Sequence, residues 1–142
     1  MSPFNAFLIL RGVLTLPMRV RRHSENAMQV AGFLARHPAV RETRYPGLAE
    51  DPGHGVAAGF LDRFGGMVGF AIRRGAEGIA PFRSALRLCK PWTSLGDVET
   101  LIQPHDRDDR RGIPDGYVRL SVGLEDPDDI IADLDQALKQ AE

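Results

Sequence analysis

The stretch GYVRLSVGLED, residues 116–126, joins a strand pattern to the start of the last helix. Aromatic and β-branched residues favour strands, and Tyr117, Val118 and Val122 surround a single arginine, Arg119. Burying an arginine costs free energy unless a carboxylate or phosphate meets its planar guanidinium group. Arg119 is therefore a candidate carboxylate-binding residue. The alternative is that Arg119 faces solvent from the polar side of a half-buried strand.

The residues after this strand predict a capped helix. Asp126 is a good N-cap and Pro127 suits the first helical position. Two further aspartates follow, and their charge is favourable at the positive end of the helix dipole. The buried stripe of this helix is expected at Ile130 or Ile131, Leu134 and Leu138.

The beginning of the chain predicts one long helix over about residues 3–36. Ser2 and Pro3 form a reasonable helix start, and Pro17 should kink the helix because its ring removes a backbone donor. The helix should end at His37, which precedes a proline. Its amphipathic stripe follows helical spacing at Ala27, Val30, Ala31 and Leu34.

The middle of the chain predicts short strands and helices separated by turns. Strands are expected at residues 40–45, 66–72 and 87–92, a short helix around 57–61 and a helix at 75–86. With residues 102–116 as a loop, the sum is an α+β fold: a two-layer sandwich in which helices cover a small, mostly antiparallel sheet. The long N-terminal helix precedes this sandwich.

The composition predicts one soluble domain. The chain has 142 residues, 43% of them hydrophobic and 26% charged, enough for a single modest core. A net charge of −1 argues against a dedicated nucleic-acid binder. The single cysteine, Cys89, fits a reducing cytoplasm, and the first apolar run stops at Arg11, so neither a signal peptide nor a membrane span is expected.

Five short motifs, in order along the chain, resemble one enzyme family. They are SPFNAF at residues 2–7, YPGL at 45–48, FGGM at 64–67, SLG at 94–96 and the stretch at 116–126. Together they resemble the C-terminal portion of the Cys/Met-metabolism PLP-dependent enzymes, the cystathionine γ-synthase and γ-lyase group. The resemblance covers nearly the whole chain. It implies that residues 1–36 are the helix that bridges two domains and that residues 37–142 are the small α+β substrate-carboxylate domain.

The resemblance also implies roles for individual residues. Ser94 would help Arg119 hold the α-carboxylate of a small amino-acid substrate. Asp97 departs from the family, which usually has a glycine after Ser-Leu-Gly, and its charge would oppose an anion unless it turns away or pairs with Arg119. Without the resemblance, Ser94 could equally be a turn serine that bonds its own backbone.

The loop that follows is a second departure, because it is shorter and more charged than in the family. His105, Asp106, Asp108 and Asp109 could be metal ligands, but mixed charges in a loop are usually a solvated turn, and no metal site is expected.

The resemblance implies pyridoxal 5'-phosphate (PLP) chemistry, but the residues do not predict a PLP attachment site. PLP enzymes hold the cofactor on a lysine, and the chain has sixteen arginines but only Lys90 and Lys139. Lys139 lies in a solvated helix end and Lys90 precedes a proline without a phosphate cradle. The family's lysine belongs to a large N-terminal domain, which is expected to precede the point where this sequence begins. The isolated chain is therefore predicted to be inactive and to hold no covalent PLP.

Three functions remain open from the sequence. The chain is a component of a lyase or transferase of amino-acid metabolism that acts on cysteine, cystathionine, methionine or O-acylhomoserine substrates with a PLP domain from another chain. Alternatively, it is a non-catalytic binding or oligomerisation module, or an inactive remnant that retains the fold. A homo-oligomer is expected, because the apolar residues of the first helix would lose their cover without the large domain.

Overall fold

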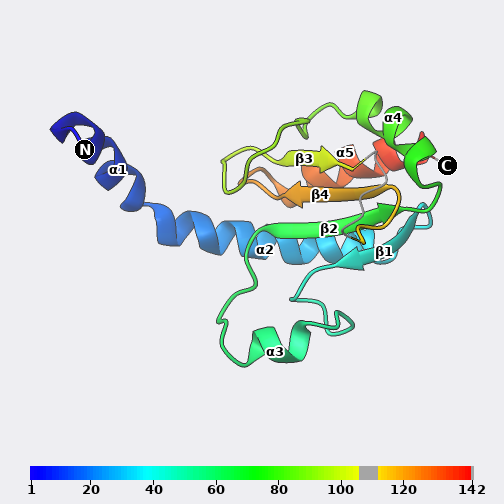
Figure 1. The fold of residues 1–142 in the computed structure, drawn as a ribbon, viewed down its shortest axis with the longest axis horizontal. Helices are drawn as coiled ribbons and strands as arrows, with labels where there is room; N and C mark the ends of the chain where they lie inside the picture. The colour runs from blue at the N-terminus through cyan, green and yellow to red at the C-terminus, as the bar shows by residue number, and fades with distance from the viewer. Residues whose placement is uncertain (106–111, 142) are drawn as a thin grey trace.

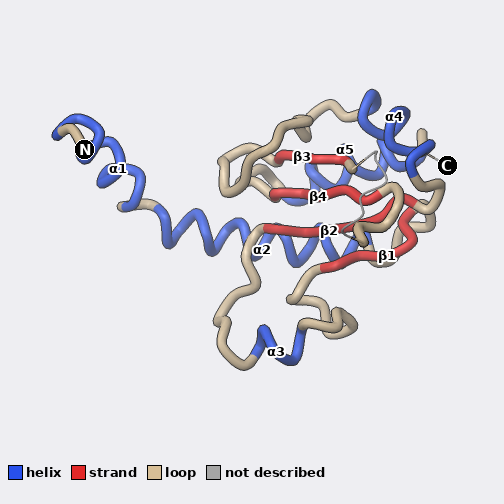
Figure 2. The backbone as a smooth tube through the Cα atoms, viewed as in Figure 1, coloured by secondary structure: helices blue, strands red, loops and turns tan. Residues whose placement is uncertain are grey.

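The structure is a computed structural model that describes residues 1–105 and 112–141. Figures 1 and 2 show a small sheet with helices packed behind it and a helical arm that extends away from it. The elements are α1 (Pro3–Val13), α2 (Leu16–Leu34), β1 (Val40–Arg44), α3 (His54–Ala58), β2 (Met67–Ile72), α4 (Ala76–Ala85), β3 (Leu101–Pro104), β4 (Tyr117–Ser121) and α5 (Pro127–Lys139).

The sheet has the strand order β1-β2-β4-β3, and its strand pairs are all antiparallel. Strand β4 is therefore an inner strand. Its central residue Arg119 lies opposite Gly69 of β2 on one side and Gln103 of β3 on the other. This register puts the arginine of the 116–126 stretch in the middle of the sheet.

Helices cover one face of the sheet, and among the described residues no helix covers the other, which we call the uncovered face. Because strand side chains alternate between faces, Val118 and Leu120 point into the core while Arg119 points to the opposite face. Helices α2 and α5 lie behind the sheet in Figure 1 and contribute many of the remaining core residues, together with Ile79 and Phe82 of α4. The predicted α+β fold with a small antiparallel sheet is confirmed. Its largest fully buried side chains include Tyr45, Phe70, Phe82, Leu34, Ile72, Ile102, Leu120, Ile130, Leu134 and Leu138.

The N-terminal segment forms two helices where the sequence predicted one kinked helix. Pro17 has no N–H to donate, and its ring crowds the carbonyl four residues earlier, at Val13, which is where α1 ends. Thr15 then becomes the N-cap residue of α2. Arg19 donates from Nη2 to the carbonyl of Gly12 at 2.8 Å and so satisfies one of the acceptors left free at the end of α1.

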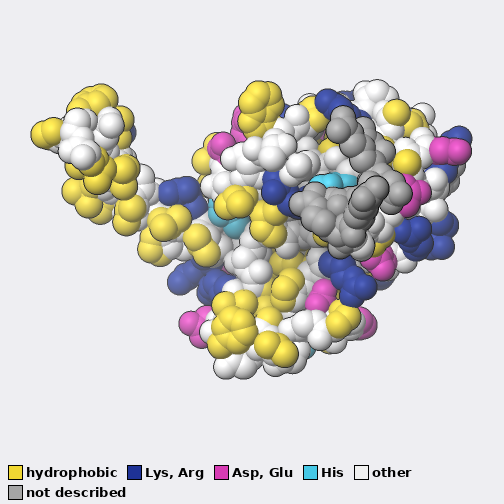
Figure 3. Space-filling model, in the orientation of Figure 1, with side chains coloured by type: hydrophobic (Ala, Val, Ile, Leu, Met, Phe, Trp, Pro, Cys, Tyr) yellow, Lys and Arg dark blue, Asp and Glu magenta, His cyan; other side chains and the backbone are white. Residues whose placement is uncertain are grey.

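Helix α1 contributes nothing to the core, since none of its residues is buried. Figure 3 shows the arm as a cluster of hydrophobic side chains that stands away from the domain. Its exposed apolar residues are Phe4, Phe7, Leu8, Ile9, Leu10 and Val13, with Leu14, Leu16 and Met18 continuing the surface into α2.

The strand predicted at residues 87–92 is wrong, because a side chain of α5 binds its backbone donors. The Asp133 carboxylate accepts hydrogen bonds from the N–H groups of Arg87, Leu88 and Cys89 at 2.8 to 2.9 Å. Of the predicted strand, an isolated bridge between Lys90 and Leu101 remains. The predicted loop 102–116 begins with residues that belong to the edge strand β3, which covers Leu101–Pro104.

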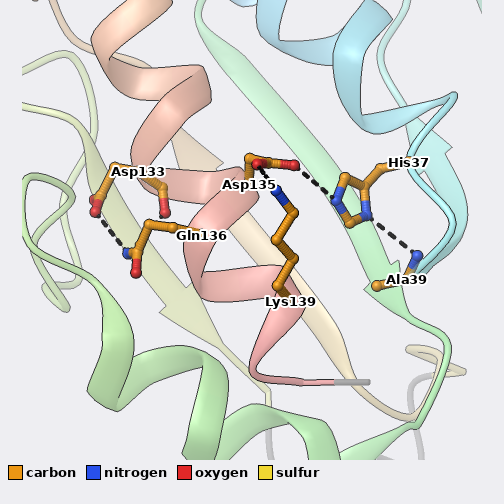
Figure 4. Close-up of polar contacts among 6 residues, drawn as sticks. All are labelled: His37, Ala39, Asp133, Asp135, Gln136 and Lys139. Carbon is orange, nitrogen blue, oxygen red and sulfur yellow. Dashed lines mark hydrogen bonds and ion pairs between the residues drawn. The ribbon is translucent and has the colours of Figure 1, made fainter.

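Polar side chains tie α5 to its surroundings, as Figure 4 shows. Gln136 donates to the carbonyl of Ala85 at 2.7 Å and to Asp133 at 3.1 Å. On the other side of the helix, Asp135 accepts a hydrogen bond from the ring of His37 at 3.3 Å. These contacts connect α5 to α4 and to the end of α2.

A membrane-spanning helix was not expected, and within the described residues no helix is both long enough and apolar enough to cross a bilayer.

Candidate functional site

Arg119 lies half-buried on the uncovered face of the sheet. Its Nη2 group donates a hydrogen bond to the backbone carbonyl of Ser94 at 2.9 Å. Its Nε–H is buried and finds no hydrogen-bond partner in the described residues. The side chain is therefore not freely solvated, no carboxylate of the described residues pairs with it, and its Nε–H remains an unused donor.

The structure brings Ser94 to Arg119 through its main chain. Ser94 is exposed and lies in the connection between Lys90 and β3. The family resemblance suggested a contribution from the serine side chain, but the observed contact uses the carbonyl oxygen. Any residue with the same backbone conformation could provide this contact.

The connection that carries Ser94 is fixed by the end of the 116–126 stretch. The N–H of Gly96 donates to the hydroxyl of Ser121 at 3.1 Å, and the N–H of Leu124 donates to the carbonyl of Val98 at 2.9 Å. The same stretch therefore supplies the arginine and holds the loop that orients it.

Glu125 completes this attachment by binding Thr100 twice. The backbone N–H of Thr100 donates to one carboxylate oxygen at 2.5 Å and its hydroxyl to the other at 2.8 Å. Gly123 allows the approach, because a Cβ at this position would lie 2.6 Å from the backbone of Glu99 and Thr100. A larger residue at Gly123 would push the Ser94 loop away from the sheet.

Asp97 is exposed, and its side chain turns towards the backbone of the next residue, Val98. Its carboxylate accepts a hydrogen bond from the N–H of Val98 at 2.6 Å, and in the described part of the chain it has no ion pair with Arg119. Of the two alternatives for Asp97, the geometry agrees with the one in which it turns away rather than pairing with Arg119.

A planar guanidinium that is oriented by a carbonyl and still has free donors suits a carboxylate or another oxyanion. A family model described as Cys/Met metabolism PLP-dependent enzyme matches residues 1–139. The chain belongs to this family.

Relatives in the family are considerably longer than this chain. L-methionine gamma-lyase of Fusobacterium nucleatum subsp. polymorphum is 43% identical over 150 residues, which cover 99% of this chain and 38% of that enzyme. Cystathionine gamma-synthase of Mycobacterium bovis is 44% identical over 144 residues, which cover 96% of this chain and 37% of that enzyme. The chain thus spans less than two fifths of the length of these curated relatives.

Solved structures of the family share the fold. The structure of cystathionine gamma synthase from Xanthomonas oryzae pv. oryzae in complex with aminoacrylate and cysteine has a TM-score of 0.89 and 40% sequence identity. The match covers 99% of this chain and 39% of that chain. The structure of a putative O-acetylhomoserine (thiol)-lyase from Campylobacter jejuni also has a TM-score of 0.89, at 35% identity.

Two residues of α2 that support the site were missed by sequence reasoning. The Asn26 amide is fully buried and donates to the carbonyls of Gly123 at 3.0 Å and Glu125 at 2.8 Å. His23 donates from Nδ1 to the carbonyl of Val122 at 2.7 Å. The signal was available, because both polar residues lie among the buried positions of an amphipathic helix and buried polar groups need partners.

The lysines of this family member do not fit a PLP attachment site. Lys90 and Lys139 are both exposed, and each forms an ion pair, with Glu99 and Asp135 respectively. A Schiff-base lysine needs an amine that is free to react with the cofactor aldehyde, whereas both of these amines are paired with a carboxylate. Neither lysine lies in the hydrogen-bonded set around Arg119.

Most of the residues that could have formed a metal site lie outside the described part of the chain. Asp106, Asp108 and Asp109 belong to that segment, and only His105 of the candidate cluster is described. Among the described residues no group of three metal-ligating side chains is present. Cys89 is buried, and burial together with the nearby charge of Asp133 raises the pKa of its thiol, so it lacks the thiolate character of a nucleophile.

Proposed function

We propose that this chain is the small C-terminal, substrate-carboxylate domain of a PLP-dependent transsulfuration-type enzyme. The substrates would be amino acids of the cysteine, cystathionine, methionine or O-acylhomoserine class. The observation that carries the proposal is the Arg119 guanidinium, half-buried on the open sheet face and oriented by the Ser94 carbonyl at 2.9 Å. Its remaining donors match the two oxygens of an α-carboxylate.

The proposed activity needs a second, PLP-bearing domain. PLP bound to a lysine supplies an electron sink for reactions at the substrate α-carbon. Since the two lysines of this chain are exposed and paired with carboxylates, we assign to this chain the binding and orientation of the substrate carboxylate only. The much greater length of the curated relatives supports such a division.

The test is an NMR titration of the chain with acetate, at constant ionic strength, that follows the Arg119 side chain. We expect saturable shifts in the wild type. Arg119→Lys keeps the charge but loses the planar fork, so its affinity should fall by about tenfold or more. The absence of saturable shifts in the wild type, or equal affinity in Arg119→Lys, would overturn the proposal.

Asp97→Gly is the matched control that tests whether a nearby negative charge affects acetate binding. Because the Asp97 carboxylate accepts a hydrogen bond from the N–H of Val98 at 2.6 Å, its removal should change acetate affinity by no more than about twofold at physiological salt. A large gain in Asp97→Gly would instead indicate that Asp97 closes the site to anions in solution.

A further inference from the structure

The uncovered face of the sheet holds a carboxylate that could compete for Arg119. Glu42 of β1 lies on this face, two positions along the strands from the row of Arg119 in the register of the sheet. Two strand spacings and two residues separate them, about 12 Å between Cα atoms, which extended arginine and glutamate side chains can bridge. Glu42 instead lies 3.6 Å from Arg44, an exposed arginine on its own strand.

The side chain of Tyr117 lies between the two charges. Tyr117 shares a row of the register with Glu42 and points to the same face as Arg119. Its ring crosses diagonally to β2, because a Cβ built on Gly69 would lie only 1.8 Å from the tyrosine hydroxyl oxygen. Gly69 is the direct cross-strand partner of Arg119, so the phenol ends beside the base of the arginine.

The electrostatics of the phenol agree with this position. Burial raises the pKa of Tyr117, and the negative charge of Glu42 raises it further. The positive charges of Arg44 and Arg119 oppose that rise. The hydroxyl is therefore within electrostatic range of the carboxylate and of both arginines.

We propose that Tyr117 is a positioning residue that separates Arg119 from Glu42. The ring lies over Gly69, where a larger residue would have its side chain. In this position it keeps the guanidinium of Arg119 at the Ser94 carbonyl, so that the remaining guanidinium donors stay available to a carboxylate. This inference rests on the proposed carboxylate role of Arg119. It assigns the ring, rather than the hydroxyl, as the part of Tyr117 that acts.

Acetate titration of four variants tests the proposal through ligand affinity. Tyr117→Phe keeps the ring, so its acetate affinity should stay within about twofold of wild type. Tyr117→Ala lets Arg119 form a partly exposed ion pair with Glu42, so its acetate affinity should fall about fivefold. The double variant Tyr117→Ala/Glu42→Gln should regain the affinity of Glu42→Gln alone. Failure of that rescue, or equal losses in Tyr117→Phe and Tyr117→Ala, would overturn the proposal.

Gly69→Ala provides an independent variant that keeps the tyrosine. The added methyl would overlap the hydroxyl position, so the ring must move and acetate affinity should fall as in Tyr117→Ala. Wild-type affinity in a folded Gly69→Ala protein would contradict the assigned position of the ring.

A measurement made without acetate tests the separation of Arg119 from Glu42 independently of the proposed carboxylate-binding function. The ¹³C resonance of the Glu42 carboxylate should shift on Arg119→Met when residue 117 is alanine and stay constant when it is tyrosine. If the wild type shows no acetate binding, the proposed carboxylate-binding role of Arg119 is overturned, but the separation of Arg119 from Glu42 is not. Equal ¹³C responses in both backgrounds would overturn the separation of Arg119 from Glu42.

Discussion

At the scale of single residues, the site depends on how Arg119 is oriented. Its hydrogen bond goes to a main-chain oxygen, which no side-chain substitution removes directly. The side chains that matter are those that hold the loop in place. Thr100 and Glu125 provide such an attachment, with contacts of 2.5 and 2.8 Å.

Ser94→Ala is therefore expected to change acetate affinity very little. It removes the hydroxyl but keeps the carbonyl that accepts from Arg119, so acetate affinity should stay within about twofold of wild type. The measurement is the same NMR titration, with Arg119→Lys as the variant that must lose affinity. A loss in Ser94→Ala as large as that in Arg119→Lys would show that the hydroxyl itself binds the ligand.

At the scale of elements, one carboxylate of α5 organises the chain before the Ser94 loop. Asp133 is buried and accepts three backbone hydrogen bonds from residues 87–89. Burial alone would raise the pKa of Asp133, but these hydrogen bonds outweigh it and lower the pKa below its usual value. The ionised form is therefore the one that stabilises the fold.

The sign of this shift predicts acid sensitivity. A carboxylate with a lowered pKa in the folded state contributes stability above its unfolded pKa of about 3.9, and this contribution is lost as the pH falls through the lower, folded value. Asp133→Asn should lower the free energy of unfolding by about 2–3 kcal/mol at neutral pH, because charged hydrogen bonds are lost in a buried place. The difference from wild type should shrink in acid.

Urea unfolding at neutral and acidic pH measures this effect. Asp129→Asn is the matched control, since Asp129 is exposed in the first turn of the same helix and should cost less than about 1 kcal/mol. Equal losses in the two variants would mean that the three backbone contacts contribute little.

At the scale of the whole molecule, the exposed apolar surface of α1 is the feature on which a prediction about association rests. Phe4 is 68% exposed, Phe7 59% and Leu10 62%, and Figure 3 shows these apolar side chains gathered at one end of the molecule. Apolar patches of this kind mark interaction surfaces. The sequence-based prediction of a homo-oligomer follows from the same residues.

We expect the chain to self-associate through this arm, which sedimentation velocity over a wide concentration range would detect. Phe7→Asp should shift the distribution towards monomer. Phe60→Asp is the matched control, because Phe60 is 71% exposed but lies after α3 rather than on the arm. Wild-type monomer at all concentrations, or equal effects of both substitutions, would contradict association through α1.

The chain by itself is also predicted to form no stoichiometric PLP adduct. Lys90 and Lys139 are each held in an ion pair with a carboxylate. Absorbance spectra of the chain mixed with PLP should show no Schiff-base band that borohydride removes. Mass spectrometry after the reduction should find no adduct at a defined lysine. A single reducible adduct on either lysine would disprove this prediction.

The sequence by itself determined the features whose causes are local. The caps of α5 at Asp126 and Pro127 depend on neighbouring residues, and so does the irregularity at Pro17, which the sequence predicted as a kink and the structure shows as a break between two helices. The buried stripe of α2 and the unusual place of Arg119 in a strand could also be predicted from spacing. The family followed from five short motifs, and the match over residues 1–139 agrees with it.

Only the tertiary structure decided the features that join distant segments. Asp133 binds backbone more than forty residues away and replaces the predicted strand at residues 87–92. Strand β3 exists because its partner, β4, lies beside it. The Ser94 carbonyl meets Arg119 across 25 residues. Local patterns cannot predict such contacts, since a backbone donor or acceptor carries no sequence signal until the fold brings its partner to it.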